Sequence, residues 1–146
     1  MKYQTQKASI GSDHAGYELK AKIEKLLVAA GLQVHDQGTH SPDSVDYPDY
    51  AHPVATQVAQ EGILGILICG SGNGVCMTAN KHAHIRAALC WSKELAMLAR
   101  QHNNANILCI PARFVSEEVA IEMVEAFLTT SFEGGRHTTR VNKISC

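Results

Sequence analysis

The spacing of hydrophobic residues alternates between two patterns along this chain of 146 residues. Short apolar runs, which are typical of buried strands, occupy residues 7–12, 32–36, 63–69, 85–89 and 107–110. After each run, apolar residues recur every three or four positions, and this spacing predicts a helix. Strands that alternate with helices predict a parallel, doubly wound α/β sheet within a single domain spanning residues 1–146.

Several predicted helices carry local signals of their own. Ser92 and Ser116 each stand where a side-chain oxygen can cap a helix. Pro53 is tolerable if it lies in the first turn of its helix. A break at Gly134-Gly135 precedes a last segment with helical spacing. The helix after Ser92 has an apolar face made of Leu95, Leu98, Ala99 and His102.

Polar residues follow the ends of the predicted strands. Ligands of doubly wound sheets bind beyond the carboxyl ends of the strands, so we expect these residues to gather at one edge. They are Asp13, His14, Asp46, Tyr47, Asp49, Cys69, Ser71 and Arg113. His102 differs because its helix leaves this edge and ends near the opposite one. We therefore expect His102 to reach such a site only from another subunit of a symmetric dimer.

Charge and cysteine content narrow the class of protein. The formal net charge is −1 and no basic block stands out, which argues against nucleic acid or a membrane surface as the main partner. The five cysteines contain no Cys-x-x-Cys pair, so a reduced cytoplasmic protein fits better than a disulfide scaffold. The N-terminus lacks the apolar core of a secretion signal, and no apolar run approaches a membrane span.

The segment from Ile66 to Gly74 delivers a cysteine into a glycine-rich loop. Glycines allow a sharp turn and present backbone N–H groups to an anion, although a tight turn without a ligand is the plain alternative. Cys69 can be a small buried hydrophobe, but its place beside N–H groups favours a thiolate. Val75 stands where a Cys-x5-Arg phosphatase loop needs arginine, so phosphoryl transfer to Cys69 is disfavoured.

Arginines suited to phosphate occur late in the chain. Arg136 and Arg140 are four residues apart and share one face if their segment is helical, and Arg113 is a third candidate. The alternative for the pair is a solvated surface. Other histidines match no zinc spacing; they are His35, His40, His52, His82 and His84. Because the sequence shows no metal or cofactor motif, we expect neither a metal ion nor a cofactor.

A phosphate site, a thiol and a histidine fit aldose–ketose isomerisation through an enediol. Cys69 would move a proton between neighbouring carbons if its pKa falls toward neutrality. The loop N–H groups would stabilise the developing oxyanion. A cyclic sugar must first open, which needs a second acid–base group such as His102 acting with Asp13.

Six short motifs run in order through nearly the whole chain. They are Gly11–Gly16, Asp46–Pro48, Cys69–Gly74, Ala79–Lys81, Arg100–Asn103 and Glu133–His137. Together they resemble the ribose-5-phosphate isomerase B family of the wider RpiB/LacA/LacB group. The resemblance implies a Rossmann-like three-layer α/β/α sandwich, with homodimers that can pair into tetramers and active sites between subunits. It also implies metal-free interconversion of D-ribose 5-phosphate and D-ribulose 5-phosphate, in the non-oxidative branch of the pentose phosphate pathway.

The resemblance assigns roles around the cysteine. Cys69 matches the proton-transfer base, and Ser71 matches a hydroxyl that assists beside it. The anion hole for the enediolate matches Gly70, Gly72, Asn73 and Gly74. Some relatives replace the cysteine with a glutamate further along the loop helix. Because Val75 and Cys76 offer no carboxylate there, the cysteine route is favoured.

The resemblance also assigns the remaining substrate contacts. His102 matches the ring-opening residue of the neighbouring subunit, with Asp13 nearby, and Asn103 matches a position that binds sugar hydroxyls. Tyr47 is expected to line the sugar pocket. The phosphate side matches His14, Arg113, Arg136 and Arg140.

Two alternatives stay open from the sequence. An isomerase of hexose 6-phosphates, such as allose or galactose 6-phosphate, differs from the first choice only in the length of the pocket. A non-catalytic module that binds sugar phosphates or nucleotides can use the same fold. The joint presence of Cys69, His102 and Asp13 favours an enzyme, because binding alone does not require it.

Overall fold

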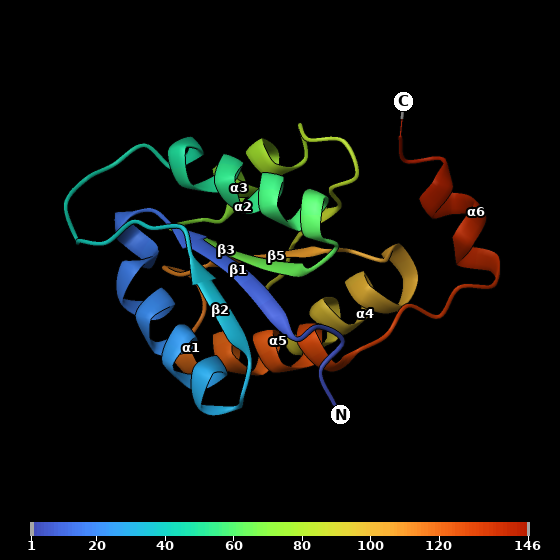
Figure 1. The fold of residues 1–146 in the computed structure, drawn as a ribbon, viewed down its shortest axis with the longest axis horizontal. Helices are drawn as coiled ribbons and strands as arrows, with labels where there is room; N and C mark the ends of the chain where they lie inside the picture. Colours follow the sequence, from blue (N-terminus) through green and yellow to red (C-terminus); the bar gives the residue numbers. More distant parts are fainter. Residues whose placement is uncertain (1, 146) are drawn as a thin grey trace.

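Figure 1 shows the chain as a computed structural model, which describes residues 2–145. Five strands form one sheet in the order β2-β1-β3-β5-β4, and every neighbouring pair is parallel. The strands are β1 Lys7–Ser12, β2 Gln33–Asp36, β3 Leu64–Cys69, β4 Ala87–Leu89 and β5 Ile107–Pro111. The predicted five-stranded parallel sheet is confirmed. β4 begins later than expected, because the Arg86 N–H donates to the Asn106 side chain at 2.8 Å.

Helices cover both faces of the sheet, which makes a Rossmann-like sandwich of three layers. In Figure 1, α2 and α3 lie on one face while α1, α4 and α5 lie on the other, and α6 stands out beyond α4. The helices are the 3-10 helix η1 His14–Gly16, α1 Tyr17–Ala29, α2 Pro48–Glu61, α3 Asn73–Ala79, α4 Lys93–Asn103, α5 Glu117–Thr129 and α6 Arg136–Asn142. Among residues 2–145, no helix is long and apolar enough to cross a membrane.

The central strand β3 divides its side chains between two hydrophobic clusters. Ile66 and Ile68 pack in the cluster that includes α1 and α5, whereas Leu67 and Cys69 pack in the cluster that includes α2 and α3. This alternation follows from the pleat of a strand, whose successive side chains point to opposite faces. Cys69 is therefore turned toward the α2–α3 face where the strand ends.

The predicted helix caps are confirmed, but the position of one proline was wrong. The Ser92 and Ser116 hydroxyls accept from the N–H groups of Leu95 and Val119, at 3.3 and 3.1 Å. Pro53 lies inside α2 rather than in its first turn. The helix begins earlier because Pro48, with its fixed φ, already occupies the first helical position.

Only part of the predicted apolar face of α4 packs on its own chain. Ala99 is buried as predicted, together with Ala96 and Arg100, while Leu95 and Leu98 remain 46% and 42% exposed. The inward position of Arg100 is stabilised by its guanidinium, which donates to the backbone carbonyls of Thr130 and Ala105. The outward residues form a line, here termed the α4 stripe, that consists of Trp91, Leu95, Leu98 and His102.

Candidate functional site

The carboxyl ends of β1 and β3 meet where the order of strands reverses. The chain passes from β1 to β2 on one side and places β3 on the other, and such a switch point is where open α/β sheets bind ligands. Asp13 follows β1 and Cys69 ends β3. The Cys69 thiol lies 3.4 Å from the Asp13 Oδ2 atom, to which it donates. Asp13 and Cys69 are only 7% and 8% exposed, so they form the floor of the switch point.

The surroundings of Cys69 oppose ionisation of its thiol. Burial is the main cause that raises the pKa of Cys69, and the negative charge and hydrogen bond of Asp13 add to it. The backbone N–H groups of Gly72 and Gly70 act in the opposite direction without reversing the result. The loop N–H groups thus favour the thiolate as expected, but the net fall of the pKa toward neutrality that the sequence suggested is not found in the free protomer. The resting site holds a thiol whose proton is directed at Asp13.

The glycine loop approaches its neighbours too closely for side chains. Gly72 has φ of +76°, and a Cβ atom there would lie 2.5 Å from Leu89. At Gly74 a Cβ atom would lie 2.4 Å from the ring of Tyr47, so this ring rests on the loop. The Ser71 hydroxyl accepts from the Asn73 N–H at 3.4 Å, at the start of α3. Tyr47 and Ser71 thus contact the loop whose Gly70 and Gly72 N–H groups face the thiol.

Two basic side chains lie at the same edge of the sheet, Arg113 beside the glycine loop and His14 directly after β1. The Arg113 N–H donates to the Gly70 carbonyl at 3.0 Å, and its exposed guanidinium lies alongside Gly70. The His14 Nδ1 atom accepts from the Val45 N–H at 3.2 Å, which leaves Nε2 as the nitrogen that bears the proton in the neutral ring. One protomer thus brings together a set termed the Cys69 cluster, comprising Asp13, His14, Tyr47, Cys69–Gly74 and Arg113.

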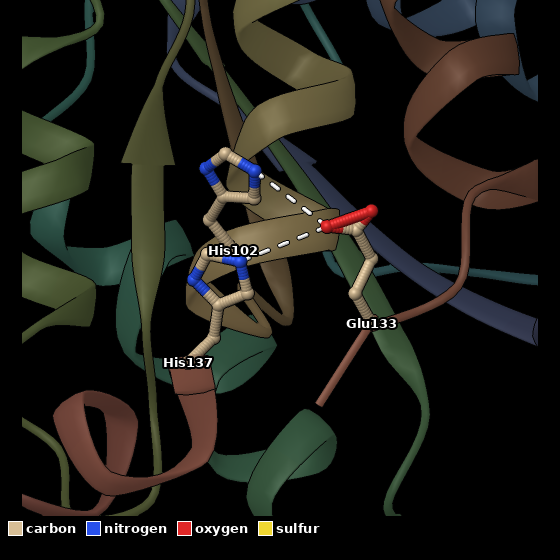
Figure 2. A group of neighbouring side chains, drawn as sticks. All are labelled: His102, Glu133 and His137. Atoms are coloured by element: carbon tan, nitrogen blue, oxygen red, sulfur yellow. Dashed lines mark ion pairs between the residues drawn. The ribbon is translucent and has the colours of Figure 1, made fainter. Parts of the chain in front are cut away.

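The other predicted site residues gather in a second group at the end of α4. Figure 2 shows the side chains of His102, Glu133 and His137 meeting there. The Glu133 Oε1 atom lies 3.6 Å from His102 Nε2 and 3.7 Å from His137 Nε2. The two imidazole rings stack with centroids 4.2 Å apart and an interplanar angle of 13°. These three residues, with Asn103, Arg136 and Arg140, are termed the His102 cluster.

Positive charge surrounds His137 in this second cluster. Desolvation lowers the pKa of His137, and the charges of His102, Arg136 and Arg140 lower it further, against the opposing effect of Glu133. Arg136 and Arg140 are exposed on α6, where the Arg140 Nη1 atom donates to the Arg136 carbonyl at 2.8 Å. The guanidiniums are thus free to meet an anion from outside the protomer.

The two clusters are well separated within one chain. α4 starts after β4 at the carboxyl edge of the sheet and ends toward the opposite edge. Figure 1 shows α6 at the far side of the molecule from the carboxyl ends of β1 and β3. His102, Asn103, Arg136 and Arg140 therefore do not join Cys69 in the same protomer, as the direction of the helix predicted for His102.

Reasoning from the sequence assigned no role to Glu133 or His137. Both lie in the Glu133–His137 segment, four residues apart, and the second is the histidine nearest to His102 in space. The i,i+4 spacing was a visible signal. The stacking on His102 was not visible, since it depends on how Gly134 and Gly135, with φ of +68° and +56°, turn the chain.

Comparison with known proteins identifies the family of this chain. The family model described as Ribose/Galactose Isomerase matches residues 8–144. A probable ribose-5-phosphate isomerase B of Mycoplasma pneumoniae is 53% identical over 137 residues, which cover 92% of this chain and 90% of that protein. Ribose-5-phosphate isomerase B of Escherichia coli is 46% identical over 140 residues, which cover 95% of this chain and 94% of that protein.

Solved structures with the same fold are also close in sequence. A ribose 5-phosphate isomerase from Thermotoga maritima superposes with a TM-score of 0.93 at 48% identity and covers 97% of this chain and 98% of its own. Ribose-5-phosphate isomerase B from Mycoplasma genitalium, solved with bound ribulose-5-phosphate, has a TM-score of 0.92 at 48% identity, with coverage of 94% and 93%.

Proposed function

The chain belongs to the ribose/galactose isomerase family, and on that premise we propose that it interconverts D-ribose 5-phosphate and D-ribulose 5-phosphate. The observation that carries the proposal is the Cys69 thiol, held against the Asp13 carboxylate and beside the loop N–H groups at the switch point of the sheet. A proton acceptor next to preorganised N–H donors is what enolisation requires. The relatives named above, one of them holding ribulose-5-phosphate, supply the sugar.

The proposed proton transfer uses groups of one protomer. The thiol first passes its proton toward Asp13, and the resulting thiolate removes the proton from C2 of the open-chain aldose. The electron pair moves into an enediolate whose oxygen accepts from the loop N–H groups between Gly70 and Gly74, with Asn73 among them. A proton then moves from the C2 hydroxyl to the C1 oxygen, and the Cys69 thiol returns the carbon-derived proton to C1, which gives the ketose. Asp13 finally gives its proton back to the sulfur. Ser71 stands beside the sulfur to assist, and Tyr47 covers the sugar.

The proposed ring opening uses the partner subunit. The α4 stripe exposes Trp91, Leu95 and Leu98, which are 48%, 46% and 42% accessible, in line with His102. A contiguous exposed apolar stripe indicates a binding surface, and a two-fold axis through it makes each chain both donor and acceptor. In this homodimer, which is free to pair into a tetramer, His102 and Asn103 of one chain reach the Cys69 cluster of the other.

The phosphate is assigned to basic side chains from both clusters. His14 and Arg113 belong to the Cys69 cluster, whereas Arg136 and Arg140 arrive with the His102 cluster of the second chain. Guanidinium groups suit phosphate because they present paired donors in a planar fork. This arrangement would hold the phosphate at the far end of an extended five-carbon chain from the carbons that exchange the proton.

A mixture of two inactive variants tests the shared site. Cys69→Ala and His102→Ala homodimers each lack one group in both sites, but a mixed dimer regains one complete site. Random exchange of subunits should therefore restore about a quarter of the wild-type specific activity. Ribulose 5-phosphate formation after co-refolding measures this. Refolding each variant alone is the control, and the absence of any rescue would contradict shared sites.

We also place the enzyme in the cytoplasm and in the non-oxidative branch of the pentose phosphate pathway. The cysteines of the described residues, Cys69, Cys76, Cys90 and Cys109, are all free thiols. Free thiols fit a reducing compartment. Fractionation of cells followed by detection of the protein tests the location.

One observation favours a second substrate class. The matching family model covers galactose isomerases as well as ribose isomerases, so hexose 6-phosphates such as allose or galactose 6-phosphate are the alternative. The value of kcat/KM for ribose 5-phosphate should exceed that for either hexose phosphate. A clear preference for a hexose phosphate would replace the pentose assignment while leaving the proton-transfer groups unchanged.

A further inference from the structure

Three side chains of the His102 cluster converge as metal ligands do. One ligand atom from each of His102, Glu133 and His137 lies within 4.8 Å of the others. The carboxylate oxygen is 3.6 and 3.7 Å from the two Nε2 atoms. Bonds of about 2.0–2.2 Å to a tetrahedral zinc ion place its ligands roughly 3.3–3.6 Å apart. To coordinate one ion, the stacked rings of His102 and His137 need only tilt until the Nε2 lone pairs of both point at that ion.

The backbone builds this arrangement from segments distant in the sequence. His102 lies in the last turn of α4, and the Glu133 N–H donates to the Gln101 carbonyl at 3.0 Å, which anchors the incoming chain. The positive φ angles at Gly134 and Gly135 then turn the chain so that His137, in the first turn of α6, stacks on His102. Glu133 and His102 are 50% and 39% exposed, so an ion can enter.

The ligand set selects a class of metal. Two imidazoles and one carboxylate suit zinc, cobalt or nickel, whereas magnesium and calcium prefer oxygen ligands alone. Three protein ligands leave an open position for water. The positive charges of Arg136 and Arg140 on α6 oppose a cation, whereas the negative charge of the Glu133 carboxylate favours one.

We propose that His102, Glu133 and His137 form a binding site for a divalent zinc-class ion, and that the bound ion inhibits the isomerase. The site itself stands independently of the proposed function, whereas the inhibition rests on it. An Nε2 lone pair of His102 that is committed to a metal cannot carry a proton. Ring opening therefore stops, while proton transfer at Cys69 continues.

Direct binding tests the site without reference to activity. Titration with Co²⁺ should give one ion per chain with a visible absorption typical of low coordination number, and without the charge-transfer band of a cobalt–thiolate bond. Zn²⁺ should displace the cobalt, and Mg²⁺ should not. The E133Q and H137Q variants should each weaken binding at least roughly tenfold, since loss of an outer partner alone costs that much.

The chain offers a matched control for adventitious histidine binding. His52 Nδ1 lies 2.7 Å from His82 Nε2, so these residues form another close pair, to which residues 2–145 add no third ligand. H52Q should leave cobalt binding unchanged. Absence of the cobalt spectrum in the wild-type protein, or full binding in both E133Q and H137Q, would overturn the site.

Inhibition is tested with two readouts on the wild-type enzyme. Zn²⁺ should reduce ribose 5-phosphate turnover reversibly, with recovery in EDTA, but should spare the exchange of solvent deuterium into acyclic ribulose 5-phosphate. E133Q should resist the inhibition. If Zn²⁺ inhibits E133Q as strongly as the wild-type enzyme, or also abolishes deuterium exchange, the inhibition comes from binding to thiols. Either result would overturn the inhibitory role of the site. Metal binding by a chain without isomerase activity would retain the site and reject the proposed function.

Discussion

The Cys69 cluster and the His102 cluster differ in how the fold holds them. Asp13 and Cys69 are 7% and 8% exposed at the ends of central strands, whereas His102 and Glu133 are 39% and 50% exposed at a helix end beside α6. Helix α6 contains no buried residue. The sheet therefore fixes the first group rigidly, while the second is presented outward on the protomer surface. Each protomer would therefore supply its Cys69 cluster to one proposed site and its His102 cluster to another.

The charges of the two clusters differ as well. The carboxylate of Asp13 helps to raise the pKa of the Cys69 thiol, whereas arginines help to lower the pKa of His137. A proton is thus retained at the first cluster and repelled from the second. On the proposed function, we expect this difference to favour proton transfer on carbon at the first cluster and ring opening at the second, with phosphate contacts from both.

The largest effect is expected from Cys69→Ala. Loss of the base should lower turnover of ribose 5-phosphate by about 10³–10⁴-fold, near the upper range for acid–base groups. Deuterium exchange into ribulose 5-phosphate, followed by NMR, should fall equally because it needs the same base. Cys76→Ala, which alters a half-buried thiol on α3, is the control. Retained exchange in Cys69→Ala would mean that another group moves the proton.

A smaller and selective effect is expected from His102→Gln. Turnover of cyclic ribose 5-phosphate should fall about 10²-fold because ring opening loses its acid–base group. Exchange into acyclic ribulose 5-phosphate should stay near the wild-type rate. Loss of both turnover and exchange would show that the two clusters act in one step. The separation of ring opening from proton transfer on carbon would then be wrong.

The proposed contact between subunits is tested by Leu98→Glu. A carboxylate in the centre of the α4 stripe should weaken the dimer by about tenfold or more, a cost of at least ~1.4 kcal/mol. Sedimentation at decreasing concentration measures dissociation, and turnover should decline with it. Leu26→Glu is a matched control, since Leu26 is 48% exposed on α1. Dissociation of the control alone would place the interface on α1 instead.

The smallest effect is the shift in pH dependence expected for Asp13→Asn, which also removes the proposed acceptor of the thiol proton and leaves solvent water to take that proton. Removal of a negative charge beside Cys69 favours the thiolate, so the thiol pKa should fall. The thiolate is the active base. The low-pH limb of the pH–rate profile for deuterium exchange should therefore move to lower pH. The amide oxygen can still accept from the Gly16 N–H, as Asp13 Oδ1 does at 3.1 Å, which preserves the turn. Displacement of this low-pH limb to higher pH would contradict the inference that the charge of Asp13 raises the pKa of Cys69.

Local features of the fold followed directly from the sequence. β1 was predicted with its observed bounds, and the caps at Ser92 and Ser116 were predicted from one residue type at one position. These signals are local, because a strand pattern and a cap hydrogen bond involve only neighbouring residues. The start of α2 was missed, since either Pro48 or Pro53 alone satisfies the rule for a first turn.

The candidate site was predictable as a set of residues but not as a geometry. Chain direction correctly separated His102 from the carboxyl edge. The sign of the Cys69 pKa shift was missed, because it depends on burial and on a carboxylate 56 positions away along the sequence. The outward turn of Leu95 and Leu98 was also missed, since helical spacing identifies an apolar face but not which molecule covers it.

The sequence by itself determined the alternation of strands and helices, the glycine loop after β3, and the family to which the motifs point. The tertiary structure alone decided that Asp13 meets Cys69 and that His102 stacks on His137. Periodicity acts over a few residues, whereas a thiol 3.4 Å from a carboxylate requires two strands to end side by side. The chemistry of this protein lies in those contacts, which only the folded chain creates.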